Sequence, residues 1–294
     1  MNLDRFGMDT ITLAGPLEAK LRAVREGGFT QIMLAARDIV GHPDGEAAAI
    51  AAVRASGLRV TGFQVLRDFE GLAGHLHEYK IDIAKSMLTM CHALGSKVLL
   101  ICSTTSAHAT DERERMVADL RKLAMLAVPF GINVAYEALS WGRFVNQVQE
   151  AWELVDTADR HNLGLAVDSY HMLATGTPVE VLDDIDPAKI LFVQLADFMW
   201  QNTPTPDERR ETARHFRVFP GEGVHSDTIA ALMRRLDDNG YAGDMSFEVF
   251  NDDYVQLPLA TVVERARRSV DWLLGQVPRR SLPFRRGPAR VAER

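Results

Sequence analysis

The chain has 294 residues, of which 47% are hydrophobic and 25% are charged, a composition typical of a globular protein with a large core. Its formal net charge of −7 gives no overall positive field, so nucleic acid is not an expected partner. No window approaches about 18 uninterrupted apolar residues, the start lacks a signal-peptide pattern, and two cysteines are too few for a disulfide framework. We therefore expect a cytoplasmic protein that does not bind a membrane.

Short apolar runs alternate with amphipathic stretches along the chain, at a repeat of about 30 residues that is typical of βα units in a parallel sheet. Helical patterns such as residues 17–26 and 117–128 separate the runs, and glycines such as Gly57 and Gly131 close several of them. The predicted strands are residues 6–12, 29–36, 59–66, 97–104, 132–139, 163–169, 190–197 and 245–251. Such units without a linker favour an α/β fold of one domain, a (β/α)8 TIM barrel over residues 1–277. An open doubly wound sheet gives similar local patterns.

Two segments depart from this regular alternation. About thirty mostly polar residues lie between Asp197 and a helical pattern near Asp227, whereas βα loops usually have about 2 to 6 residues. Residues 206–214 within this connection predict a short helix, and long loops in compact domains are often functional. Residues 278–294 contain six arginines and one acid and are expected to form a basic, flexible C-terminal tail.

The last four predicted strands carry an acid or an amide near their C-terminal ends, namely Glu137, Asp168, Gln194 and Glu248. Strands of a parallel barrel are almost entirely apolar, so such groups need a partner, a metal or a catalytic task. The C-terminal ends of all strands open on one face, and the four side chains are therefore expected to converge. Three carboxylates would repel each other there, and a divalent cation converts that repulsion into ligation. The pattern favours a site for Mg²⁺, Mn²⁺ or Co²⁺, with Zn²⁺ also compatible, over salt bridges at the barrel mouth.

Three further polar residues are predicted to lie on the same face. His171 follows Asp168 by three residues and could act as an acid or a base near neutral pH. Arg67 follows the third strand and Arg217 lies in the long connection, and either could clamp a carboxylate with two hydrogen bonds. Taken singly, each fits a salt bridge or a loop anchor equally well. The chain has no Gly-x-Ser-x-Gly elbow, Walker loop or dinucleotide fingerprint.

At this point the sequence resembles the xylose-isomerase-like barrels, which include sugar isomerases, epimerases and an endonuclease branch. Within that group it is most similar to the metal-dependent bacterial 3-dehydroshikimate dehydratases. The more specific matching segments are Arg67-Asp-Phe-Glu-Gly71 and Glu137-Ala-Leu-Ser-Trp-Gly-Arg143, with His215-Phe-Arg-Val-Phe-Pro-Gly-Glu-Gly223 in the long connection. One segment departs from the pattern: after the second strand these dehydratases usually carry acids, whereas this chain has Met33-Leu-Ala-Ala-Arg37-Asp38.

The resemblance implies that Glu137, Asp168, Gln194 and Glu248 hold a divalent metal, and that His171, Arg67 and Arg217 serve substrate binding and proton transfer. The implied reaction is dehydration of 3-dehydroshikimate, an anionic ring acid, to protocatechuate through a metal-stabilised enolate. Two alternatives stay open. One is a sugar or cyclitol isomerase, epimerase or dehydratase, and the other is a non-catalytic barrel that keeps a metal and binds a ligand. The sequence is compatible with a homo-oligomer as well as with a monomer.

Overall fold

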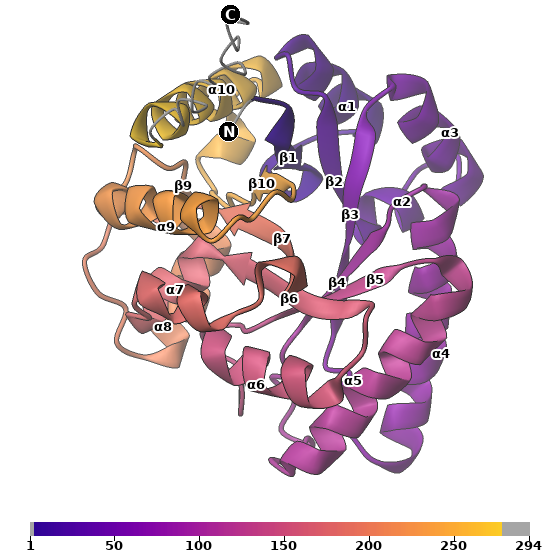
Figure 1. Ribbon diagram of the computed structural model, residues 1–294. Coiled ribbons are helices and arrows are strands. Elements are labelled where there is room, and N and C mark those ends of the chain that lie inside the picture. Colours follow the sequence, from indigo (N-terminus) through magenta and orange to yellow (C-terminus); the bar gives the residue numbers. More distant parts are fainter. Residues whose placement is uncertain (1–2, 278–294) are drawn as a thin grey trace, which may run out of the picture.

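The computed structural model describes residues 3–277, in which eight parallel strands close into a barrel (Figure 1). The strands follow the chain around the barrel, and the first, β1, pairs with the last, β10. They are β1 (Phe6–Asp9), β2 (Gln31–Ala35), β3 (Arg59–Arg67), β4 (Val98–Cys102), β5 (Asn133–Glu137), β6 (Leu163–Asp168), β7 (Ile190–Leu195) and β10 (Met245–Phe247). The predicted (β/α)8 barrel of one domain is confirmed, and all eight predicted strands are present. The predicted basic tail, residues 278–294, lies outside the described residues.

Helices surround the barrel on its outer side (Figure 1). The longer ones are α1 (Leu17–Glu26), α3 (Glu46–Ser56), α4 (Gly74–Ala93), α5 (Arg113–Ala127), α6 (Val148–Ala158), α9 (Ser226–Asp238) and α10 (Leu259–Gln276), and α2 (Ala36–Val40) and α7 (Ser169–Thr175) follow β2 and β6 directly. Among the described residues, no helix combines the length and the apolar character needed to span a membrane.

Helix boundaries follow from local chemistry. Gln147 and Glu150 form a capping box that satisfies the first free N–H groups of α6. Gly57, which ends α3, has a φ of +69°, a left-handed conformation that glycine adopts without steric cost. Helix α1 buries Leu17 and Leu21, which are one turn apart, against the barrel.

The alternation of side chains along each strand produces two apolar layers. In β4, Val98, Leu100 and Cys102 belong to a small cluster that fills the barrel interior. Leu99 and Ile101 belong to the larger cluster, which the strands share with the surrounding helices. Because both faces of each strand are buried, an acid within such a strand lies next to apolar groups unless it reaches the barrel mouth.

The long connection after β7 folds back over the strand ends. It contains β8 (Asp197–Phe198), α8 (Pro206–His215) and β9 (Arg217–Val218), and β8 and β9 pair in antiparallel fashion. The predicted short helix is thus confirmed as α8, which begins with a capping box of Thr205 and Glu208. The backbone N–H of Arg217 donates to the carbonyl of Phe250 at 2.9 Å, which fixes β9 beside the end of β10.

Candidate functional site

Four polar side chains lie at the C-terminal ends of neighbouring strands. Glu137 and Asp168 are the last residues of β5 and β6, Gln194 is the next to last of β7, and Glu248 directly follows β10. Strand pairing places Gln194 level with Asp168 on one side and with Ser246 on the other. All four are buried, with exposed fractions of 6% or less. They therefore form a polar cluster at one end of the barrel, which we call the acid cluster.

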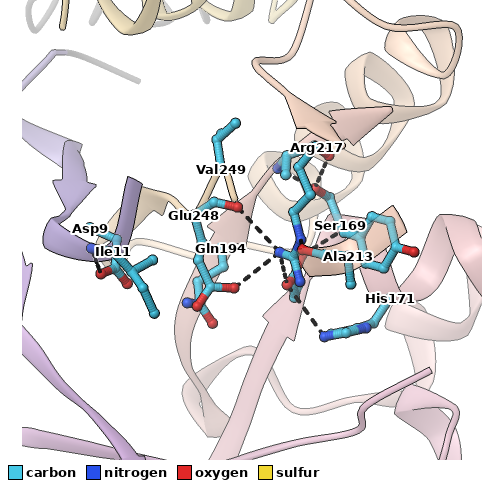
Figure 2. Close-up of polar contacts among 12 residues, drawn as sticks. Asp9, Ile11, Ser169, His171, Gln194, Ala213, Arg217, Glu248 and Val249 are labelled. Carbon is cyan, nitrogen blue, oxygen red and sulfur yellow. Dashed lines mark hydrogen bonds and ion pairs between the residues drawn. The ribbon is translucent and has the colours of Figure 1, made fainter. Parts of the chain in front are cut away.

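The guanidinium of Arg217 lies within the acid cluster (Figure 2). Its Nη1 donates to Asp168 Oδ2 at 2.7 Å and to Glu248 Oε2 at 3.0 Å, and its Nε donates to the carbonyl of Ala213 at 3.0 Å. The group is 4.4 Å from the ring centroid of Tyr170 and is only 2% exposed. Arg217 is thus an internal counter-charge, and its side chain joins two of the predicted ligands to each other.

Two oxygen atoms of the acid cluster have no hydrogen-bond partner among the described residues, Glu137 Oε1 and Gln194 Oε1. The other carboxylate oxygen of Glu137 accepts a hydrogen bond from Cys102 Sγ at 3.0 Å. Burial, followed by the charges of Asp168 and Glu248, raises the pKa of Glu137 well above its usual value. Unpaired buried oxygens are costly, so this side of the cluster fits a cation bound through oxygen.

Asp168 and Glu248 experience two opposing influences. Burial raises the pKa of each carboxyl, whereas the charge of Arg217 lowers it. Asp168 Oδ1 also caps α7 by accepting from the N–H of Tyr170 at 2.7 Å. One candidate ligand atom each of Glu137, Asp168 and His171 lies within 4.8 Å of the other two. These residues differ from the predicted ligands, because His171 takes part while Glu248 is drawn toward Arg217.

His171, on α7, lies beside the acid cluster and is almost fully buried. Its Nε2 is 3.6 Å from Asp168 Oδ2, while its Nδ1 receives the backbone N–H of Ser140 at 3.2 Å and lies 3.0 Å from Ser140 Oγ. The rings of Trp141 and Tyr170 contact the imidazole edge-on. Burial and then the charge of Arg217 hold the pKa of His171 well below its usual value. The imidazole is therefore held in one orientation in its neutral form.

A cavity of about 250 Å³ opens over the acid cluster. Five of the seven predicted site residues line it, namely Arg67, Glu137, His171, Arg217 and Glu248, and Asp168 and Gln194 do not. Arg67 ends β3, is exposed and makes no ion pair with another described residue. Five predicted residues from different elements thus meet at one cavity, where Arg67 lies on the opposite side of the barrel from β7.

Sequence reasoning missed Asp9 and Gln64. Asp9 ends β1, is fully buried, and accepts from the N–H of Ile11 at 2.9 Å (Figure 2). The amide of Gln64 donates to Asp9 and, at 3.0 Å, to Glu248. Burial and Glu248 raise the pKa of Asp9 well above its usual value. The signal was present, because each is a polar residue near the end of an apolar strand.

Residues 21–275 match the family described as the xylose isomerase-like TIM barrel, and the chain belongs to this family. It is 35% identical over 265 residues to a 3-dehydroshikimate dehydratase of Pseudomonas aeruginosa, which covers 90% of this chain and 41% of that protein. It is 28% identical over 197 residues to an inosose isomerase of Bacillus subtilis, which covers 66% of this chain and 68% of that protein. The chain therefore spans about two fifths of the length of the dehydratases that it matches.

A crystal structure of the IolI protein with a bound zinc atom has the same fold. It superposes with a TM-score of 0.80 at 22% identity, covering 92% of this chain and 98% of that one.

Proposed function

We propose that this chain is a divalent-metal-dependent dehydratase that converts 3-dehydroshikimate to protocatechuate. The observation that carries the proposal is the buried acid cluster next to His171, with the free Arg67 on the same cavity, in a chain 35% identical to a named dehydratase. The reaction needs a group that polarises a ketone, a group that moves a proton, and a cation that holds a carboxylate. The cavity has candidates for each role.

Glu137, Asp168, Gln194 and Glu248 are the residues that would hold the metal. Charge balance supports this assignment, because three ionised carboxylates and Arg217 leave two uncompensated negative charges, which a divalent cation would cancel. The unpartnered oxygens of Glu137 and Gln194 supply donors that the protein itself does not satisfy. When bound, such a cation supplies Lewis-acid polarisation of a carbonyl oxygen. The structure of IolI, which has the same fold, contains a bound zinc atom, and this supports a metal-binding role for the present chain.

His171 is proposed as the proton-transfer group. Two groups of Ser140 lie near Nδ1 of His171. The hydroxyl Oγ, at 3.0 Å, can accept a hydrogen bond, and the backbone N–H, at 3.2 Å, donates one. This role needs the tautomer with the proton on Nδ1, in which Ser140 Oγ replaces the backbone N–H as the partner of that nitrogen. The lone pair of Nε2 is then available to remove the proton beside the substrate ketone. The same nitrogen would then return that proton to the departing hydroxyl, so that water leaves, and transfer of a further ring proton to the ketone oxygen makes the ring aromatic. Ser140 is a positioning residue in this scheme.

Arg67 is proposed to hold the substrate carboxylate. It lines the same cavity as Glu137 and His171, and it makes no ion pair with any described residue, so its fork of donors is available to a ligand. The guanidinium of Arg217 is already engaged by Asp168 and Glu248. We propose that the main role of Arg217 is to compensate the charge of these two carboxylates and to hold them in position. Any contact that Arg217 makes with the ligand would come from this paired position.

The test is to incubate the metal-loaded chain with 3-dehydroshikimate and to follow the absorbance of the aromatic product. A second arm uses inosose and a neutral ketose, because the likeness to the inosose isomerase favours isomerisation as the runner-up. We expect aromatic product from the acid and no isomerised product from the neutral compounds. Turnover of inosose without aromatic product would replace the dehydratase proposal with the isomerase. No turnover of any substrate by metal-loaded protein would favour a binding barrel.

A further inference from the structure

A second cavity, of about 410 Å³, adjoins the first on the β2 and β3 side of the barrel mouth. The two share a wall that includes Ile11, Gln64, Arg67 and Phe250. Beyond that wall the second cavity is bounded by α2 and α4, with Ile83 and the buried Met87 from α4 among its lining residues. The two cavities are therefore neighbours, with the side chain of Arg67 on the boundary between them.

The second cavity has a charge character of its own. Three cationic side chains line it, Arg37, Arg67 and Lys80, and its lining includes no acid. We call it the cationic cavity. The first cavity, by contrast, is lined by Glu137 and Glu248 as well as by Arg67, Arg214 and Arg217. An acid-free cluster of three cations is unexpected in a chain whose net charge is −7.

The acids closest in sequence to these cations are engaged elsewhere. Asp38, next to Arg37, is bound to Lys20 at 2.8 Å. Asp68, next to Arg67, accepts from the N–H of Thr105 at 2.7 Å, which turns it toward the loop after β4. Among the described residues, neither Arg37, Arg67 nor Lys80 has an ion-pair partner, and their charges are left for a ligand.

Lys80 also helps to fix the position of Arg67. Lys80 donates its ammonium to the backbone carbonyl of Arg67 at 2.7 Å, which ties α4 to the end of β3. Arg37 stands in α2, and its side chain is exposed. The apolar side chains of Ile83 and Met87 provide a surface for a hydrocarbon spacer between two polar ends of a ligand.

We propose that the cationic cavity is a subsite for a carboxylate or phosphate group carried on the part of a ligand that extends away from the acid cluster. Arg37 is its specificity-determining residue, because it lines this cavity and not the first. The inference rests on the proposed function only in that the acid cluster is taken to bind the oxygen-bearing ring. The ligand class is a ring with adjacent oxygens that bears an anionic group on a short side chain.

The experiment compares two catechol acids by calorimetric titration of the metal-loaded chain. Protocatechuate has its carboxylate on the ring, and dihydrocaffeate has the same ring with the carboxylate two carbons farther away. Each is titrated into the wild type, Arg37→Gln and Arg214→Gln. Arg214 is the matched control, because it is also an exposed arginine but lines only the first cavity. Circular dichroism checks that both variants fold.

We expect Arg37→Gln to weaken dihydrocaffeate about tenfold, the lower end of the range for a charge-assisted hydrogen bond, and protocatechuate less than about twofold. Arg214→Gln should leave the ratio of the two affinities unchanged. Inorganic phosphate tests a free anion, and it should compete with dihydrocaffeate in the wild type but not in Arg37→Gln. Equal weakening of both acids by Arg37→Gln, or no weakening, overturns the inference.

Binding is measured here without turnover, so this result and the proposed function can fail separately. A chain that binds the two acids as expected but forms no protocatechuate from 3-dehydroshikimate refutes only the dehydratase proposal. A chain that dehydrates normally but binds dihydrocaffeate equally well with Gln at position 37 refutes only the subsite.

Discussion

The two ends of the barrel use the same kinds of polar side chain in opposite ways. At the end where strands begin, Arg59 of β3 binds both oxygens of Asp244, each at 2.7 Å, and also reaches Gln31 at 2.6 Å. At the end where strands finish, Glu137 and Gln194 each keep an oxygen without a partner among the described residues. At the first end the charges of Arg59 and Asp244 are paired and partly open to solvent, although Gln31 Nε2 has no partner among the described residues. The second end is buried and has more acids than cations.

This contrast separates stability from function. The charges of Arg59 and Asp244 compensate each other near the surface, so removing this pair is expected to cost little stability. The acid cluster has three carboxylates and one arginine, and its carboxyl pKa values are raised because burial and mutual repulsion oppose ionisation. Incomplete electrostatics of this kind are typical of binding and catalytic sites. Changes at the two ends should therefore have effects of very different size.

The largest effect is expected from removing the metal. Exhaustive chelation should abolish turnover of 3-dehydroshikimate, and Mn²⁺, Co²⁺ or Mg²⁺ should restore it. Glu137→Gln, which removes one charged ligand, should lower metal affinity by about 10- to 100-fold or more while the fold is retained. Metal content measured by elemental analysis, together with the rate of product formation, checks both statements. Full activity of metal-free protein would contradict them.

His171→Asn should have the next largest effect. Loss of the proposed proton-transfer group should lower kcat by about 10²- to 10⁴-fold, while metal content stays near that of the wild type. Because Ser140 only orients the imidazole, Ser140→Ala should lower kcat less than His171→Asn does. Steady-state kinetics of the metal-loaded variants provide the measurement. An almost unchanged kcat in His171→Asn would make His171 a spectator.

A smaller effect is expected at Arg67. Lysine keeps the charge but cannot form the planar pair of hydrogen bonds with a carboxylate, so Arg67→Lys should lower kcat/KM for 3-dehydroshikimate about 10- to 100-fold. Arg210→Lys is the matched control, because Arg210 is an arginine of α8 that is paired with Asp207. If the two variants have the same kcat/KM, Arg67 does not bind the substrate carboxylate.

The smallest effect should occur at the other end of the barrel. Asp244→Asn removes the charge from a pair whose side chains are 28% and 56% exposed. It should therefore lower the free energy of unfolding by no more than about 1 kcal/mol and leave kcat/KM unchanged within about twofold. Denaturant unfolding and the product assay test this together. A large loss of activity would mean that the two ends are coupled and that their comparison fails.

Much of the barrel and of the acid cluster could be predicted from the sequence, because both follow from local pattern. A polar residue that interrupts an apolar strand near its end, as in Glu137 or Asp168, is visible without any tertiary information. Asp9 obeys the same pattern and could have been included. The pairing of Arg217 with Asp168 and Glu248 could not be predicted, because it depends on how β9 returns from a long connection.

The cationic cavity was also beyond sequence reasoning. Arg37 and Lys80 are separated by more than forty residues and belong to different helices, so their convergence depends on the packing of α2 and α4 around β3. In the segment Arg67-Asp-Phe-Glu-Gly71, the strand pattern predicted the place of Arg67, and the other residues were identified only through resemblance. Glu70 within it is fully buried and receives Thr104 N–H at 2.6 Å and the hydroxyl of Tyr136 at 2.9 Å. Asp68 and Glu70 of this segment therefore hold the loop after β4 in place, a role that residue spacing in the sequence does not predict.

The pairing of β1 with β10 has a consequence for how the molecule assembles. Phe6 pairs with Met245, so the ring closes only when contacts form between the two ends of the described chain. Glu248 follows that last strand, and Arg217 enters from the segment just before it and binds Glu248. The third carboxylate and its counter-ion are thus delivered by the same part of the chain. Completing the barrel therefore brings the third acid of the cluster and the arginine that compensates it to the site together.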